Sequence, residues 1–200
     1  MKIVSVVLEN KDIILEPLTL NHVDELLPVA INPELWLLTT VVIRGREDLY
    51  SYISKALEEK EKGTALPFAI KIKATGEYVG STRFGNIDIS NKRVEIGWTW
   101  IGVSWQRSFV NTGMKLLMLQ HAFEVWGCNR VELKTDALNT RSRNAILRIG
   151  AKEEGTLRNH MIVFDGRIRD SVYFSIISDE WSSVKENLDK KLRYNQKTLF

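Results

Sequence analysis

The stretch EIGWTWIGVSWQRSFVNT (residues 95–112) runs from a predicted strand, through a loop, into a predicted helix over 111–126. The wide apolar face of that helix predicts deep burial. A helix N-terminus leaves backbone N–H groups free and carries a partial positive charge. A loop that wraps this end can therefore bind a pyrophosphate without a metal ion, and Arg107 adds a positive charge there. We expect an anion site between the strand and the helix.

The pattern of apolar residues on both sides of this stretch predicts the fold class. Apolar residues recur at helical spacing over much of the first third of the chain, and they then alternate along strands separated by turns. The predicted strands cover 13–17, 66–72, 78–89, 93–101, 130–135, 153–164 and 169–177. This order predicts an α+β fold in a single domain over 1–200, with a mixed, mostly antiparallel sheet of about six or seven strands flanked by helices.

Helix boundaries are predicted from residues that favour helix ends. The predicted helices cover 20–31, 46–62, 111–126, 139–150 and a C-terminal segment over 179–200. Gly127 is placed to end the long helix in a left-handed conformation, and Asn139 is placed to cap the short one. Ser178 suits the N-cap of the last helix. We expect the Lys-rich and Asn-rich tail from Lys185 to be solvated and frayed.

Composition excludes several classes of protein. Charged residues make up 26% and hydrophobic residues 44% of the 200 residues, as in ordinary globular domains. The net charge of +3 is spread along the chain, so we expect no nucleic-acid partner. The first ten residues have no cleavage pattern and no run of roughly 20 apolar residues. We expect no membrane segment and a cytoplasmic location, and the single cysteine, Cys128, agrees with a reducing compartment.

Several motifs of enzyme chemistry are missing from the sequence. There is no Gly-x-Gly-x-x-Gly after a strand, no Walker loop, no Gly-x-Ser-x-Gly elbow and no His-Glu-x-x-His. His22, His121 and His160 are widely separated, so we predict no metal site. We expect Cys128 to be a small buried side chain and not a nucleophile.

Together with residues 95–112, four later segments resemble the GNAT superfamily of N-acetyltransferases, in particular its RimJ/RimL-type branch. These segments are DALNTRS at 136–142, GA at 150–151, RNH at 158–160 and DGR at 165–167. Their order and spacing match the family, and the resemblance covers nearly the whole chain. It implies the GNAT fold, with a sheet that splays at the cofactor site. It also implies acetyl-CoA as co-substrate, with its pyrophosphate on the loop at 106–111.

The resemblance also implies the residues that bind the cofactor. They are Trp100, Ile101, Gln106, Arg107, Ser108, Phe109, Val110, Asn111, Asn139 and Ser142. Phe109 and Asn111 stand where the family's loop usually has small residues, and Gly113 stands where the branch usually has Glu. Phe adopts a positive φ less readily than Gly. We therefore expect either a turn that is built differently or a lower affinity for the cofactor.

Glu95 is the candidate general base. Amide formation from a thioester needs a group that takes the proton of the amine. Regular alternation along the strand places Glu95 on the face opposite to Trp98 and Trp100, and the resemblance makes that face the acceptor cleft. The alternative is a solvent-exposed Glu95 that pairs with Arg93 or Lys92.

Ser142 is the second candidate catalytic residue, because it resembles the family's residue near the CoA sulfur. A serine hydroxyl is a poor acid, so we expect it to act on the departing thiolate mainly by positioning and hydrogen bonding. The alternative is an ordinary exposed helix serine. Asn139 is expected to cap the helix in either case.

The activity that the resemblance implies is acetyl transfer to a primary amine, most concretely the α-amine of a protein or peptide N-terminus. Small-molecule amines, such as amino acids, polyamines or aminoglycosides, are the alternative acceptors. A CoA-binding module without turnover is a further alternative, motivated by Phe109, Asn111 and Gly113. If the chain associates, we expect a homodimer, the commonest assembly.

Overall fold

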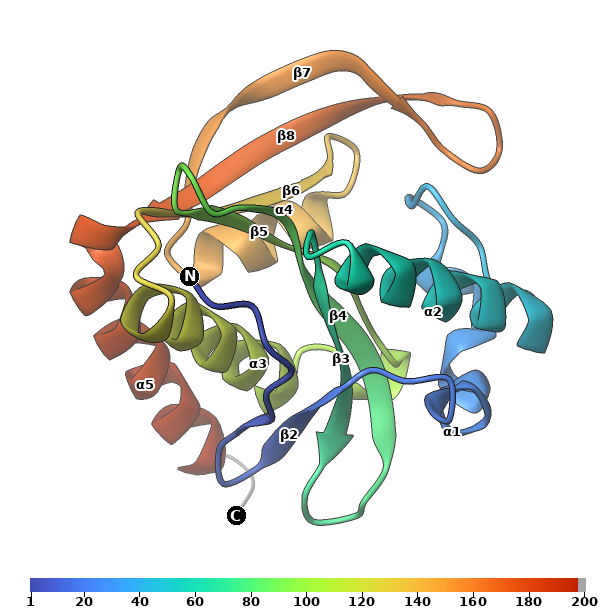
Figure 1. Ribbon diagram of the computed structural model, residues 1–200, viewed down its shortest axis with the longest axis horizontal. Coiled ribbons are helices and arrows are strands. Elements are labelled where there is room, and N and C mark those ends of the chain that lie inside the picture. Colours follow the sequence, from blue (N-terminus) through green and yellow to red (C-terminus); the bar gives the residue numbers. More distant parts are fainter. Residues whose placement is uncertain (198–200) are drawn as a thin grey trace.

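The computed structural model describes residues 1–197, which form an open sheet with helices on both faces (Figure 1). The α-helices are α1 (His22–Ala30), α2 (Arg46–Glu61), α3 (Phe109–Gln120), α4 (Thr140–Arg148) and α5 (Trp181–Lys197). Positions 198–200 of the predicted C-terminal segment lie outside the described residues. Within residues 1–197, no helix is long and apolar enough to cross a membrane.

Eight strands form the sheet, in the order β1-β2-β3-β4-β5-β6-β8-β7. They are β1 (Leu8–Glu9), β2 (Ile13–Pro17), β3 (Leu66–Ile72), β4 (Tyr78–Asp88), β5 (Arg93–Ile101), β6 (Arg130–Asp136), β7 (Lys152–Ile162) and β8 (Ile168–Ile177). β5 and β6 pair in parallel, whereas the other neighbouring strands pair antiparallel. The predicted α+β class and mixed sheet are confirmed. The sheet has one strand more than expected because the two-residue β1 pairs with β2.

The two faces of the sheet carry separate apolar cores. α3 and α5 cover one face, where Met114 and Leu188 pack with sheet residues such as Phe84. α1 and α2 cover the other face, where Leu26 and Leu49 belong to a second cluster. A side chain of β5 therefore points either to α3 or to the face that carries α1 and α2 (Figure 1).

The predicted helix and strand boundaries agree with the structure at most positions around the loop at 102–108. β3 and β5 have the predicted bounds. The long helix begins two residues earlier than predicted, at Phe109, and after Gln120 it continues as a π-helix over His121–Val125. Gly127 follows with a φ of +63°, a conformation that glycine adopts at little cost, so the predicted end of the helix is confirmed.

The last helix differs from the prediction at its start and along its length. Ser178 does not cap it, because a 3-10 turn over Ser178–Glu180 comes first and the Glu180 carboxylate accepts a hydrogen bond from the Ile177 N–H at 3.1 Å. The segment after Lys185 is not a solvated tail: Leu188 is completely buried in the core beneath α3. The many charged residues of this segment lie beside an apolar stripe that the prediction missed.

Candidate active site

The centre of the sheet forks between β5 and β6. Their parallel pairing covers three positions and ends where Glu95 lies opposite Glu132. Beyond this point β5 continues to Ile101 and β6 to Asp136 without pairing with each other. Backbone N–H and C=O groups along the inner edges of the fork can therefore bind an inserted molecule. The predicted splay is present, and Glu95 lies where it opens.

Glu95 is buried at this fork, with 3% of its surface exposed. Its Oε2 accepts hydrogen bonds from Asn86 Nδ2 at 2.8 Å and from Lys134 Nζ at 3.0 Å, so side chains from β4 and β6 hold it. Its Oε1 accepts no hydrogen bond from the described part of the chain, which leaves that oxygen for a water molecule or an amine. The alternative of an exposed Glu95 paired with Arg93 or Lys92 is wrong.

Irregular backbone surrounds Glu95 on β4 and β5. Asn86 has a φ of +48° and Trp98 a φ of +49°. The pairing of β4 with β5 shifts register near both residues. Residues other than glycine are uncommon at positive φ, and backbone strain of this kind clusters at functional sites. The bulges thus mark the same part of the sheet as the fork.

The bulge at Trp98 overturns the predicted alternation of β5. The Trp98 ring lies over Gly85, where an added Cβ would approach the ring to 2.2 Å. Trp100 packs against Trp36, with 5.6 Å between ring centroids, in the cluster beneath α1 and α2. Because one extra residue reverses the alternation, Trp98 and Trp100 lie on the face of Glu95 and not opposite to it. The Tyr52 hydroxyl donates to the Trp98 carbonyl at 3.2 Å and ties α2 to the bulge.

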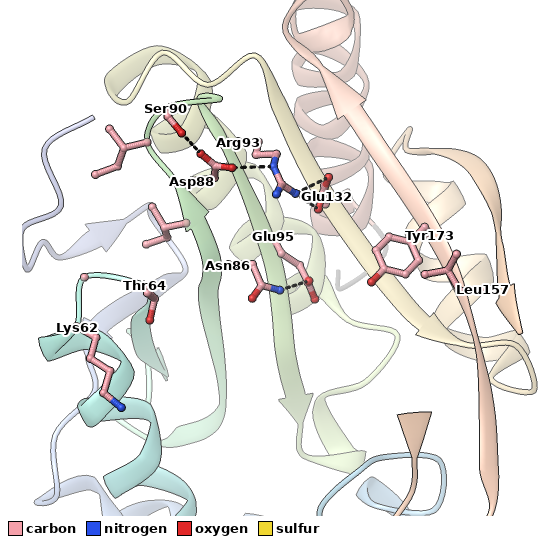
Figure 2. A pocket seen from close by; sticks show the side chains of 13 residues that line it. Lys62, Thr64, Asn86, Asp88, Ser90, Arg93, Glu95, Glu132, Leu157 and Tyr173 are labelled. Atoms are coloured by element: carbon pink, nitrogen blue, oxygen red, sulfur yellow. Dashed lines mark hydrogen bonds and ion pairs between the residues drawn. The ribbon is translucent and has the colours of Figure 1, made fainter. Parts of the chain in front are cut away.

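An open cavity of about 910 Å³ lies in front of Glu95. Figure 2 shows Glu95 and Asn86 facing this space, with Tyr173 and Leu157 across from them. The cavity is lined by Lys62, Gly63, Thr64, Asn86, Ile87, Asp88, Ile89, Ser90, Arg93, Glu95, Glu132, Leu157 and Tyr173. Its charged lining consists of three carboxylates, from Asp88, Glu95 and Glu132, and two cations, from Lys62 and Arg93.

The turn over residues 103–108, directly before α3, contains no glycine. Ser108 is the N-cap, and its hydroxyl accepts a hydrogen bond from the Val110 N–H at 3.2 Å and donates to the Trp105 carbonyl at 2.6 Å. Arg107 takes the left-handed conformation, with a φ of +60°, and Phe109 is already helical. The positive φ of this turn therefore falls on Arg107 and not on Phe109. This turn still presents the N-terminus of α3.

The start of α4 lies beside this loop. The Asn139 side chain accepts a hydrogen bond from the Ser142 N–H at 2.9 Å, which confirms the predicted cap. Arg141 Nη1 donates to Gln106 Oε1 at 2.8 Å, and Gln106 Nε2 donates to the Ile101 carbonyl at 3.0 Å. The structure thus brings the predicted residues Gln106, Asn139 and Ser142 to the open end of the fork. Ser142 makes no side-chain hydrogen bond with the described residues.

Three of the predicted cofactor residues have buried side chains. Trp100 and Ile101 are packed in the two cores, so only their backbone groups can reach a molecule in the fork. Val110 is also buried, whereas Asn111 is half-buried. The side chains of Arg107 and Arg141 are exposed and provide the positive charge at the helix start.

Sequence reasoning missed three charged or polar residues of the site. Asn86 and Lys134 bind Glu95, and Arg141 binds the loop before α3. Asn adopts positive φ more readily than most residues. An Asn inside a predicted strand is therefore a sequence signal for a bulge, and it could have indicated Asn86. No local signal indicates Lys134, because its contact with Glu95 depends on the register of two strands that are far apart in the sequence.

Cys128 and the histidines take no part in the arrangement around Glu95. Cys128 is buried as predicted, and burial raises the pKa of its thiol to about 11, which disfavours the reactive thiolate. Among residues 1–197, no group of three or more His, Cys, Asp or Glu side chains could hold a metal ion.

Comparison with known proteins identifies the family of this chain. Residues 12–152 match the family model of the acetyltransferase (GNAT) domain. The chain is 31% identical to the uncharacterized N-acetyltransferase p20 of Bacillus licheniformis over 121 residues, which is 60% of this chain and 67% of p20. It is 33% identical to YdaF of Bacillus subtilis (strain 168), a candidate ribosomal N-acetyltransferase, over 110 residues, or 55% of this chain and 59% of YdaF.

A solved structure extends the similarity to almost the whole fold. The crystal structure of a GCN5-related N-acetyltransferase from Brucella melitensis has a TM-score of 0.89 at 29% identity, over 96% of this chain and 87% of that chain. The family model covers more than half of the chain. The chain therefore belongs to the GNAT family of N-acetyltransferases.

Proposed function

We propose that this enzyme transfers the acetyl group of acetyl-CoA to a primary amine, most concretely the α-amine of a protein or peptide N-terminus. The observation that carries the proposal is Glu95: a buried carboxylate with a free oxygen, at the point where the fork meets an open cavity. The similarity to YdaF, a candidate ribosomal N-acetyltransferase, supports a protein acceptor.

The described residues fit acetyl-CoA. The unpaired edges of β5 and β6 offer backbone groups to an extended chain that carries amides. The N-terminus of α3, with Arg107 and Arg141 beside it, suits a diphosphate. The bound co-substrate supplies an acetyl group that is activated as a thioester.

The enzyme's own residues handle the proton and the developing charges. Glu95 Oε1 accepts the proton of the acceptor's ammonium group, directly or through one water molecule, so that the neutral amine can attack. Backbone N–H groups on the inner edge of β5 stabilise the developing oxyanion. The Ser142 hydroxyl, free of other partners among the described residues, donates a hydrogen bond to the departing thiolate.

Thiol release with acetyl-CoA tests the proposal, with N-terminal peptides, amino acids, polyamines and aminoglycosides as acceptors. Glu95→Gln should lower kcat by about 100-fold or more, the range of a lost general base, with the melting temperature little changed.

Glu132→Gln is the matched control, because Glu132 lies opposite Glu95 in register but accepts hydrogen bonds from Arg93 and Arg130. It should lower the rate far less. Turnover that is unaffected by Glu95→Gln would remove Glu95 from the mechanism, and tight CoA binding without turnover on any amine would favour the binding module.

A further inference from the structure

Arg169 on β8 is a buried cation without a partner. Arg169 has 7% of its surface exposed, and its Nε is completely enclosed. Burial lowers the pKa of the guanidinium, against the charges of Asp136 and Glu95, which raise it. None of its nitrogens makes a hydrogen bond or ion pair with the residues that the structure describes. An enclosed guanidinium nitrogen without an acceptor is unfavourable, and the group's other nitrogens are free to bind one.

Ser171 provides a second unpaired donor on the same strand face. Residues two apart on a strand point the same way, so Arg169, Ser171 and Tyr173 share a face. Ser171 is fully buried and its Oγ also lacks a partner. Tyr173 lines the cavity and lies opposite Lys134, the residue that binds Glu95. The unpaired donors therefore lie along the strand face that leads to the candidate base.

The carboxylates that act on Arg169 already have closer cations. Asp136 forms an ion pair with Arg167 at 2.6 Å, and Glu95 forms one with Lys134 at 3.0 Å. Arg169 therefore forms no ion pair with either carboxylate. Since a guanidinium matches the planar, bidentate geometry of a carboxylate, an acceptor that carries a carboxylate suits this position.

We infer that Arg169 binds a carboxylate of the acetyl acceptor, so that the preferred substrates carry a carboxylate close to the reacting amine. This inference rests on the proposed acetyl transfer. A free amino acid presents such a group as its α-carboxylate, and a peptide presents it as an N-terminal Asp or Glu side chain. The amine then lies towards Glu95 and the carboxylate towards β8.

Matched acceptor pairs test the inference on the full chain. One pair is alanine and alaninamide, and the other is a peptide that begins with Asp and the same peptide beginning with Asn. In the wild type, kcat/KM should favour the carboxylate member of at least one pair by about tenfold or more. The amino-acid pair tests the α-carboxylate and the peptide pair tests the side chain, so the two sources are distinguished.

Variants of Arg169 assign the preference to this residue. Arg169→Gln should reduce the preference to near one by raising the acceptor KM, with the KM for acetyl-CoA unchanged, whereas Arg169→Lys should keep part of it. Arg158→Gln, at an exposed position on β7, is the control for long-range charge and should keep the full preference. If Arg169→Gln does not fold, the wild-type ratio and Arg169→Lys still decide.

The outcomes separate this inference from the proposed function. A wild type that acetylates amines but prefers neutral or cationic acceptors would overturn the carboxylate site alone. A raised KM for acetyl-CoA in Arg169→Gln would also overturn it, because Arg169 would then belong to the co-substrate's site. Absence of acetyl transfer to any amine would overturn the proposed function itself.

Discussion

Lys115 is a buried lysine on the inner side of α3. It lies in the second turn of α3 with 6% of its surface exposed, and its ammonium group makes no hydrogen bond or ion pair with the described residues. Burial lowers its pKa to about 7, although the charge of Glu95 acts in the opposite direction. A lysine in this environment reduces the stability of the folded state when it is protonated.

Replacing Lys115 should change how stability depends on pH. The ordinary lysine pKa is 10.5 and the folded value is about 7, so between these pH values the unfolded chain binds more protons and the free energy of unfolding rises with pH. Lys115→Met should lose this rise and be more stable than wild type at pH 7 by about 1–4 kcal/mol. Urea unfolding of both proteins at pH 7 and pH 10 measures the difference, which should shrink at the higher pH.

Lys115→Arg is the control, because it stays charged and should be less stable than Lys115→Met at both pH values. Equal stabilities of wild type and Lys115→Met at pH 7 would contradict the prediction.

At the scale of elements, the turn before α3 places two opposing demands on Arg107, one on its backbone conformation and one on its charge. Arg107 is exposed, has a φ of +60°, and stands next to the N-cap Ser108. The conformation favours glycine, whereas the proposed diphosphate site favours a cation. At the proposed site, the charge of Arg107 therefore favours diphosphate binding, whereas its backbone conformation costs stability.

Two substitutions at Arg107 test the effects of its charge and of its backbone conformation separately. Arg107→Gly and Arg107→Ala both remove the charge, so both should raise the KM for acetyl-CoA, by about 3- to 10-fold. Only Gly removes the cost of the left-handed backbone, so Arg107→Gly should be more stable than Arg107→Ala by about 1 kcal/mol. Initial rates and chemical unfolding measure the two effects. An unchanged KM in both variants would show that the diphosphate does not bind at this turn.

At the scale of the whole molecule, the last helix closes the core on the α3 side of the sheet. Leu188 is completely buried, and Trp181 stacks on Phe123 with 5.4 Å between ring centroids. α5 thereby supports the helix whose other end faces the proposed diphosphate site (Figure 1).

Loss of this packing should lower stability. Leu188→Ala removes buried methyl groups and should lower the free energy of unfolding by about 2–5 kcal/mol. Lys190→Ala is the control, because its side chain is 71% exposed and the change should stay within about 0.5 kcal/mol. Thermal and chemical unfolding measure both. A loss below about 1 kcal/mol for Leu188→Ala would mean that α5 contributes little to the core.

The sequence alone was sufficient for the elements whose signals are local. Periodicity predicted β3 and β5 with their bounds, the position of Gly127 predicted the end of the long helix, and Asn139 predicted the cap of α4. Each of these depends on residues within a few positions of one another, so no tertiary contact is needed to infer it. The segment at 95–112 and its resemblance also indicated the family.

The tertiary structure decided how side chains meet across strands. Periodicity cannot show that a bulge at Trp98 reverses the faces of β5, nor that Leu188 turns a polar segment into part of the core. The pairing of Glu95 with Lys134 and the lack of a partner for Arg169 depend on contacts between strands that are far apart in the sequence. Register and burial set which charges are paired, and both arise only when the whole sheet has formed.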